Sequence, residues 1–137
     1  MKVILALMLV VSMACSAFGS SYELEPNGSQ DNATEVLSGQ TFNANSFKSD
    51  VDYFALNATA NDIITSQINR TASDIENWFY FSIIQNNNTL YSSQFIKRPN
   101  ESNSTGPFKT RVRSTGQVFL KLESDGFCDY SVTMEIE

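Results

Sequence analysis

The chain has 137 residues, of which 42% are hydrophobic and 12% aromatic; it carries fifteen acidic residues, nine basic residues and no histidine. This length accommodates one domain with a single core, and the hydrophobic content argues against a wholly disordered chain. The lack of histidine excludes Ser-His-Asp and Cys-His catalysis and every histidine-ligated metal site. The acidic balance disfavours nucleic acid as a partner, because phosphate backbones repel negative charge.

The N-terminus has the pattern of a secretory signal peptide. Lys2 precedes an unbroken run of apolar or small residues at 3–14, which has the length of an h-region and is too short to span a bilayer. Ala17 and Gly19 place small residues where signal peptidase reads them. We therefore expect residues 1–19 to be removed and the protein to be secreted. No second hydrophobic run follows, so no membrane span is expected.

A lipoprotein is the alternative interpretation of the same segment. Cys15 would then become a lipid-anchored first residue, tethering the protein to the cell surface. Ser12 stands where a lipobox usually has a branched aliphatic residue, which favours plain secretion. Either cleavage removes Lys2 and no acidic residue, so the mature chain is one charge more negative than the −6 of the full sequence.

Cysteine and asparagine give weaker signals. Cys128 is the only thiol beyond the signal region, so no intrachain disulfide is available. It is expected to fill a small space in the core, with a disulfide-linked dimer as the alternative. Seven Asn-x-Ser/Thr sequons are more than chance predicts and suit a secreted glycoprotein, although a polar, turn-rich β-domain reaches such a number by composition alone. They start at Asn27, Asn32, Asn57, Asn69, Asn87, Asn100 and Asn103.

The remaining chain reads as a polar leader at 20–35, followed by a β-domain at 36–137. Short β-branched and aromatic runs alternate with Asn, Asp, Gly and Ser turns, and no credible helix appears. A loop rich in Pro, Asn and Ser is expected at 97–106. About eight short strands predict an all-β, two-sheet antiparallel sandwich, jelly-roll-like in form. The expected strands are 36–37 and 41–44 (a hairpin), 53–56, 63–69, 78–85, 89–93, 108–113, 118–123 and 130–136.

The order of motifs resembles the bacterial pre-peptidase C-terminal domain family. The leader Glu23-Leu24-Glu25-Pro26-Asn27-Gly28-Ser29 is similar to that family's Glu-x-Glu-Pro-Asn-Asp-Ser segment. Asp50-Val51-Asp52-Tyr53-Phe54 is similar to its Asp-x-Asp-aromatic-Phe strand, and the stretch 115–132 to its closing strands. The resemblance covers nearly the whole mature chain. It implies a jelly-roll-like sandwich that in this family accompanies a secreted protease, whereas here we expect a free-standing member.

The resemblance also implies a calcium site, because leader residues and nearby aspartates hold calcium in the collagen-binding members. The corresponding residues are Glu23, Glu25, Asn27, Asp50 and Asp52, whose side chains supply the oxygen ligands that calcium requires. Gly28 departs from the pattern, since the family has an aspartate there. The alternative is that these acids are splayed apart and merely solvated.

Two carboxylate pairs have a spacing that suits a glycosidase, Asp74 with Glu76 and Glu123 with Asp125, but both flank turns. We therefore expect no enzymatic activity. Lys109, Arg111 and Arg113 alternate with apolar or small residues, which places them on one strand face. A solvated outer face is the favoured interpretation of these three residues, and a docking surface for an acidic partner is the alternative. With Tyr80 and Tyr91 they form the candidate binding surface. Tyr53 and Trp78 are further candidates for contact, although core packing is the favoured interpretation of both.

The sequence thus predicts a secreted, non-catalytic binding or accessory module that recognises an extracellular protein or polysaccharide. The alternative function is a structural or adhesive cell-surface component that assembles through its own sheet edges.

Overall fold

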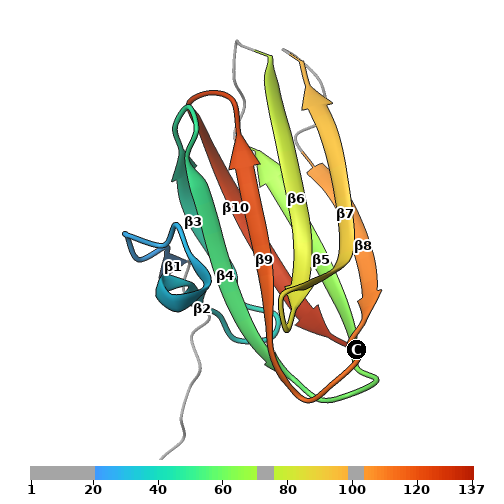
Figure 1. The fold of residues 1–137 in the computed structure, drawn as a ribbon. Helices are drawn as coiled ribbons and strands as arrows, with labels where there is room; N and C mark the ends of the chain where they lie inside the picture. Colours follow the sequence, from blue (N-terminus) through green and yellow to red (C-terminus); the bar gives the residue numbers. More distant parts are fainter. Residues whose placement is uncertain (1–20, 71–75, 99–103) are drawn as a thin grey trace, which may run out of the picture.

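Ten strands form two five-stranded sheets, packed face to face, in the part of the chain that the computed structural model describes: residues 21–70, 76–98 and 104–137 (Figure 1). The predicted two-sheet β-sandwich is therefore confirmed. The strands outnumber the expected eight because the leader contributes two short ones. The expected signal peptide at 1–19 and the lipidation site Cys15 lie outside the described residues.

Each sheet is built around long antiparallel strands. Sheet A has the order β1 (Ser21–Tyr22), β3 (Thr41–Ser46), β10 (Cys128–Ile136), β5 (Ile63–Arg70) and β8 (Ser104–Arg111). Sheet B has the order β2 (Thr34–Glu35), β4 (Val51–Ala58), β9 (Gly116–Ser124), β6 (Asn77–Gln85) and β7 (Asn88–Lys97). Only the two leader strands pair in parallel, β1 with β3 and β2 with β4.

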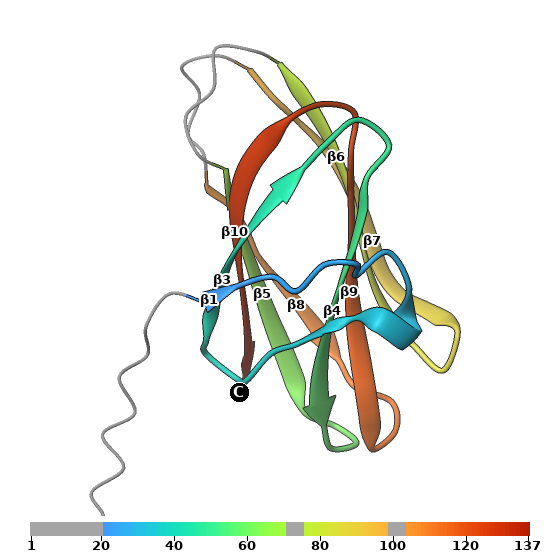
Figure 2. The same cartoon turned by 90° about the vertical axis from the view of Figure 1, so that its left-hand side faces the viewer.

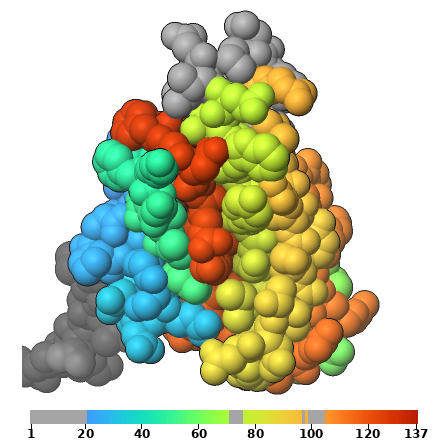
Figure 3. Space-filling model, turned by 45° about the horizontal axis from the view of Figure 1, so that its top comes forward, coloured from blue at the N-terminus to red at the C-terminus, as the bar shows by residue number. Residues whose placement is uncertain are grey.

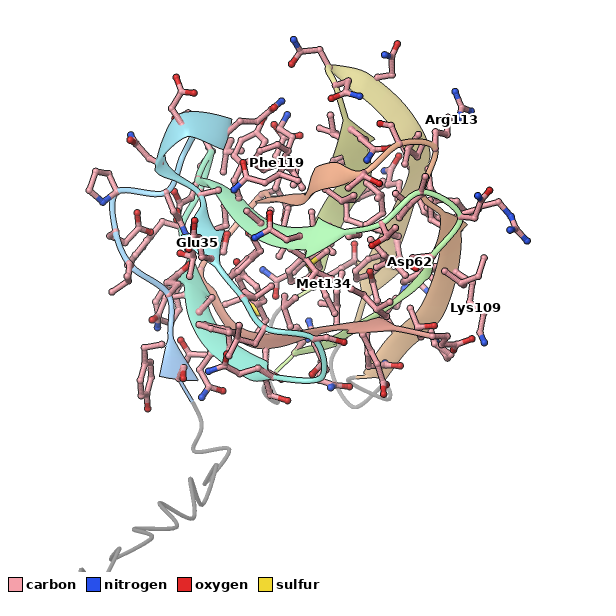
Figure 4. All side chains as sticks on the ribbon, turned by 90° about the horizontal axis from the view of Figure 1, so that it is seen from below. Glu35, Asp62, Lys109, Arg113, Phe119 and Met134 are labelled. Carbon is pink, nitrogen blue, oxygen red and sulfur yellow. The ribbon has the colours of Figure 1, made fainter. Side chains whose placement is uncertain are left out.

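Alternation along the strands places the core between the sheets. In β10 the side chains of Tyr130, Val132 and Met134 are buried, whereas their neighbours are exposed or half-buried, which is the expected period of two. Met134 lies between the two layers in the view from below (Figure 4). Aromatic rings from both sheets fill the rest of the core. The largest fully buried side chains are Tyr130, Phe54, Phe79, Phe81, Ile64, Ile68, Ile83, Leu120, Leu122, Met134, Val112 and Val118.

The leader crosses the side of the sandwich from one sheet to the other (Figure 2). It leaves β1 on sheet A, passes through a short 3-10 turn at Gln30–Asn32 and reaches β2 on sheet B. The chain then returns to sheet A at β3. In the space-filling view the blue and cyan leader lies directly against β3 and β4 (Figure 3).

This crossing overturns one prediction from the sequence. The hairpin expected from 36–37 and 41–44 is wrong, because β2 and β3 belong to different sheets. Val36 is buried and its N–H donates to the carbonyl oxygen of Ala55 at 2.9 Å, on sheet B. The turn residues Ser38 and Gly39 therefore connect the two layers and do not close a hairpin.

A second difference concerns the loop expected at 97–106. Residues 99–103 lie outside the described part, but β8 already begins at Ser104, earlier than the strand expected from 108. Its register with β5 shifts between Ser66 and Ile68, where Gly106 has a φ of 109°. Pro107 is tolerated because β8 is an edge strand and the bulge re-aims its backbone.

Candidate functional site

The leader and β4 bring acidic side chains together at one side of the sandwich. Carboxylate oxygens of Glu23, Glu25 and Asp52 lie within 4.8 Å of one another. We refer to these three residues as the carboxylate cluster. The leader is held against β4 at this point, because the N–H of Tyr53 donates to the carbonyl oxygen of Asn27 at 3.0 Å. The side chains of Glu23 and Asp52, far apart in sequence, meet as a result.

Asn27 organises the leader side of the cluster. Its Nδ2 donates to Oε2 of Glu23 at 2.9 Å, and its backbone N–H donates to Oε2 of Glu25 at 2.9 Å. The second oxygen of Glu23 accepts from the backbone N–H of Asn45 on β3 at 2.7 Å. Asn27 is fully buried, yet its Oδ1 has no hydrogen-bond partner. A buried amide oxygen without a partner is unusual in a folded protein.

Asp52 forms the floor of the cluster. It is fully buried, and one of its oxygens accepts a hydrogen bond from the Tyr130 hydroxyl on β10. Its other oxygen, Oδ1, is buried without a partner. Burial raises the pKa of Asp52 from 3.8 to about 7, and the nearby charges of Glu23, Asp50 and Glu25 add to the shift, while the Tyr130 hydrogen bond opposes it. Burial also raises the pKa of Glu23.

The donor set fits calcium. Calcium takes six to eight oxygens at about 2.3 to 2.6 Å, so two oxygens on the same ion lie at most about 5 Å apart. The three clustered carboxylates satisfy this distance. Glu23, Glu25 and Asp52 would hold the ion, and Oδ1 of Asp52 is a buried oxygen without another partner. Asn27 contacts the cluster through its Nδ2 and its backbone N–H. Such an ion would neutralise acids that are costly to gather without a counter-charge.

Asp50 lies outside the carboxylate cluster, although the sequence placed it among the five ligands. Its Oδ1 accepts from the backbone N–H of Val51 at 3.1 Å. It is half-buried and lines a separate cavity of about 370 Å³ together with Tyr80 and Glu123. Its charge still raises the pKa values of Glu23 and Asp52, so it contributes to the negative potential at the cluster.

The predicted basic residues gather at the opposite side of the sandwich. Lys109, Arg111 and Arg113 are exposed, whereas Thr110 and Val112 between them are buried, which is the expected alternation. The side chains of Lys109 and Arg113 extend outward on the same side of the molecule (Figure 4). We call the adjacent cavity of about 440 Å³ the basic groove; it is lined by Asn61, Leu90, Tyr91, Lys109, Thr110, Arg111, Val112 and Arg113.

The two tyrosines of the predicted binding surface line different cavities. Tyr91 on β7 lines the basic groove and packs against Phe81 and Phe108, with ring centroids 5.6 and 5.8 Å away. Tyr80 on β6 is 46% exposed, lines the cavity beside Asp50 and lies outside the basic groove. The other two candidate contact residues, Tyr53 and Trp78, are both half-buried.

The remaining chemical candidates have structural partners. Glu76 pairs with Arg98 at 3.3 Å, Glu123 pairs with Lys121 at 2.9 Å, and Asp125 accepts from the backbone N–H of Trp78. Asp74, the proposed partner of Glu76, lies outside the described residues. Cys128 is a free, buried thiol, as expected. Of the described sequons, Asn27 is fully buried and therefore unavailable to a glycan in the folded protein.

Sequence reasoning missed Tyr130 and Asn45, which complete the surroundings of the cluster. Tyr130 was assigned to the core by its period of two, and that pattern carries no sign that its hydroxyl reaches Asp52. Asn45 acts through its backbone N–H, to which the identity of the side chain gives no clue. The Tyr130 contact joins β10 of sheet A to β4 of sheet B, and the Asn45 contact joins β3 to the leader, so both are set by tertiary packing.

The fold is a two-sheet β-sandwich with a carboxylate cluster at one side and a basic groove at the other. No family model matches the chain, and no curated protein matches it. Among solved structures, it is similar to the pre-peptidase C-terminal domain of collagenase from Bacillus anthracis, with a TM-score of 0.52 and 11% identity over 85% of this chain and 97% of that chain. The resemblance seen in the motifs is thus confirmed at the level of the fold.

A second solved structure with a similar fold is PliG of Aeromonas hydrophila, a periplasmic lysozyme inhibitor of g-type lysozyme. The TM-score is 0.50 and the identity 9%, over 87% of this chain and all of that chain. Among the described residues, no helix is long and apolar enough to cross a membrane.

Proposed function

We propose that this protein is a secreted, non-catalytic binding module of the pre-peptidase C-terminal type, in which calcium holds the leader on the sandwich. It recognises an extracellular protein or polysaccharide and acts outside the cytoplasm, at an extracellular or periplasmic location. The observation that carries the proposal is the carboxylate cluster, where the carboxylates of Glu23, Glu25 and Asp52 meet and one buried oxygen of Asp52 has no hydrogen-bond partner. One of the solved structures with a similar fold is a periplasmic inhibitor of g-type lysozyme, which is consistent with a binding role.

Calcium would act as a structural clamp in this account. Glu23 and Glu25 belong to the leader and Asp52 to β4, so an ion bound by all three joins the leader to sheet B. Affinity is expected in the weak range of extracellular modules, roughly 10⁻⁴ to 10⁻³ M, because waters or backbone carbonyls must complete the shell. Extracellular calcium concentrations suffice to fill a site of this kind.

Calcium binding is tested directly by isothermal titration of the metal-free protein. Wild-type protein is expected to bind one calcium ion, and Glu25→Gln to weaken binding about tenfold or more, because it removes a charged ligand without disturbing the core. Glu35→Gln is the matched control, since Glu35 is an exposed leader acid outside the cluster. Equal binding by the Glu25→Gln and Glu35→Gln variants, or no heat from wild-type protein, would contradict the clamp.

The binding role is tested with immobilised protein and a panel of extracellular polysaccharides and proteins. At least one polymer should be retained in calcium-containing buffer, and retention should fall in an Arg111→Gln/Arg113→Gln variant. Peptidase, esterase and glycosidase assays on the same preparation are expected to stay at background. Reproducible turnover that is lost on Glu123→Gln would overturn the non-catalytic assignment.

A further inference from the structure

We propose that the free edge of β8 binds an extended segment of a partner protein in which acidic and apolar residues alternate. The segment would add a strand to sheet A beside Lys109, Thr110 and Arg111. This inference rests on the proposed function as a binding module and specifies the ligand class of its basic groove. Strand addition at a sheet edge is a general mode of peptide recognition, in which main-chain hydrogen bonds give affinity and side chains give specificity.

The position of β8 leaves one side of its backbone unpaired. It is the last strand of sheet A, and within the described part of the chain it pairs with β5 alone. β7, the last strand of sheet B, lies on the same side of the sandwich (Figure 1). The basic groove runs between these two edges, since its lining comes from both strands and from the segment that follows β8.

The pairing of β8 with β5 identifies which backbone groups are free. Val112, just after β8, turns both backbone groups toward β5, because its N–H donates to the carbonyl oxygen of Asp62 at 2.8 Å and its carbonyl accepts from Asn61 at 2.9 Å. Groups alternate along an antiparallel strand, so Thr110 also faces β5, whereas Lys109 and Arg111 face away. Ile63 on β5 is the residue opposite Arg111. Its carbonyl oxygen points away from β8, because it accepts a hydrogen bond from the backbone N–H of Glu137, and the backbone groups of Arg111 therefore have no partner on β5.

The usable edge is short. Pro107 has no N–H, and the N–H of Arg113 is already bound by Oε1 of Gln85 at 3.1 Å. The free donors and acceptors are therefore those of Lys109 and Arg111, which is enough for a ligand strand of about five residues. A short edge of this kind is protected against uncontrolled pairing and suits a specific segment.

The side chains at this edge call for an acidic partner. Lys109, Arg111 and Arg113 are the basic residues that line the groove, and Lys109 is already paired with Glu137 at 2.7 Å. Among the described residues, the guanidinium of Arg113 has no hydrogen-bond or ion-pair partner, and that of Arg111 contacts only the carbonyl oxygen of Asn61 at 3.5 Å. Carboxylates on an added strand would lie opposite these cations, and charge-assisted hydrogen bonds are stronger than neutral ones.

The groove floor accounts for the apolar half of the pattern. Every second side chain of an added strand points to the inner face of sheet A, toward β7. There Leu90 and Tyr91, both half-buried, line the groove beside buried Val112. Acidic residues on the outer face and apolar residues on the inner face therefore give the alternation that this edge accepts.

A second copy of this chain is a poor occupant of the same edge. Two β8 strands paired antiparallel about Thr110 would set Lys109 opposite Arg111, and like charges directly opposite destabilise a strand pair. A polysaccharide has no regular row of N–H and C=O groups to pair with Lys109 and Arg111, and therefore leaves the free edge unused.

The test uses fluorescence anisotropy with a short labelled peptide that alternates aspartate and valine. Wild-type protein should bind it, and the Arg111→Gln/Arg113→Gln variant should bind about tenfold or more weakly. Lys121→Gln is the matched control, because Lys121 lies on sheet B and pairs with Glu123. Thermal unfolding establishes that each variant is folded before binding is compared.

Three comparisons separate strand addition from simple charge attraction. A peptide of the same composition with its aspartates in one block should bind at least about fivefold more weakly, because it loses the alternation. N-methylation of the aspartates and N-methylation of the valines should have unequal effects, because only one alternate set of N–H groups faces β8. Equal binding by all four peptides would overturn the proposal.

The same variants distinguish failure of this inference from failure of the proposed function. If a uronate or sulfated polysaccharide binds through Arg111 and Arg113 while the peptides do not, the inference is overturned and the binding module stands. If the peptides do not bind and the polymer panel also retains nothing, the proposed function fails with it.

Discussion

At the scale of single residues, Asp52 is the most informative position in the molecule. It is fully buried with one oxygen bound by Tyr130 and the other without a partner. A buried carboxylate of this kind is tolerated when it is protonated or when a cation lies beside it. The pKa of Asp52 is raised to about 7 because burial destabilises the charged carboxylate. A bound calcium ion would favour the charged form and so offset this destabilisation.

This shift predicts how stability depends on pH in the absence of calcium. A raised carboxyl pKa means that the folded protein holds the proton more tightly than the unfolded chain, so the free energy of unfolding falls as pH rises from about 4 to about 7. Asp52→Asn should remove most of this fall, about 2 to 4 kcal/mol between wild type and variant. Urea unfolding at a series of pH values in chelator measures the difference. A wild-type protein that gains stability relative to the variant over this range would contradict the assignment.

The substitution Gly28→Asp is predicted to raise the affinity for calcium. Gly28 stands where the family motif has an aspartate, and a Cβ at this position would lie 3.5 Å from the carbonyl oxygen of Val51, an ordinary contact. Gly28→Asp should therefore fold normally and bind calcium about tenfold more tightly, because it restores a carboxylate beside the leader. Gly28→Asn, which adds no charge, is the control. Titration calorimetry compares them, and unchanged affinity in Gly28→Asp would show that position 28 is outside the site.

At the scale of elements, the leader differs most from what its composition indicates. It reads as a polar segment before the domain, but it adds an edge strand to each sheet and crosses between them. Its backbone is tied at both ends: the N–H of Glu23 donates to Asn43 on β3, and that of Val36 donates to Ala55 on β4. Between these points the leader is held by few apolar contacts, which is where a metal ion has most to contribute.

Hydrogen exchange should therefore report calcium in the leader. The amides of Glu23, Leu24 and Asn27 are all hydrogen-bonded within or next to the cluster. Calcium at a concentration well above its Kd should slow their exchange by about tenfold or more, because local opening of the leader must then release the ion. Amides of β6 and β9, buried in sheet B, serve as internal controls. Equal protection of the leader with and without calcium would contradict the clamp.

Local patterns predicted the long strands well and the connections between them less well. Asn86 and Asn87 mark the turn of the β6–β7 hairpin, where both adopt positive φ, and Ile64 and Ile68 share the buried face of β5. The crossing after Val36 was mistaken for a hairpin, because a turn between two short apolar runs looks the same whether they share a sheet or not. The sequence was enough to predict that oxygen-bearing side chains form the site. That Asp50 lies outside the carboxylate cluster and Tyr80 outside the basic groove depends on tertiary packing.

At the scale of the whole molecule, charge is separated across the sandwich. The carboxylate cluster lies beside β3 and β4, next to the leader strands that end both sheets on one side. The basic groove lies at β7 and β8, the last strands on the other side. The carboxylate cluster and the basic groove therefore share no residue, and each can be altered without removing the other. Binding at the groove should depend on calcium only as far as the stability of the fold does.

Thermal unfolding with calcium and with chelator, at a pH above 7, tests whether a calcium ion holds the leader on the sandwich. If calcium binds the folded protein with a Kd of roughly 10⁻⁴ to 10⁻³ M, a concentration of about 10 mM should add about 1.4 to 2.7 kcal/mol of stability. For a domain of this size the melting temperature should then rise by about 4 to 10 °C. The rise should fall to about half or less in Glu25→Gln and be kept in Glu35→Gln. An identical melting temperature in calcium and in chelator would mean that the acids of the leader and of β4 are a solvated rim without a bound ion.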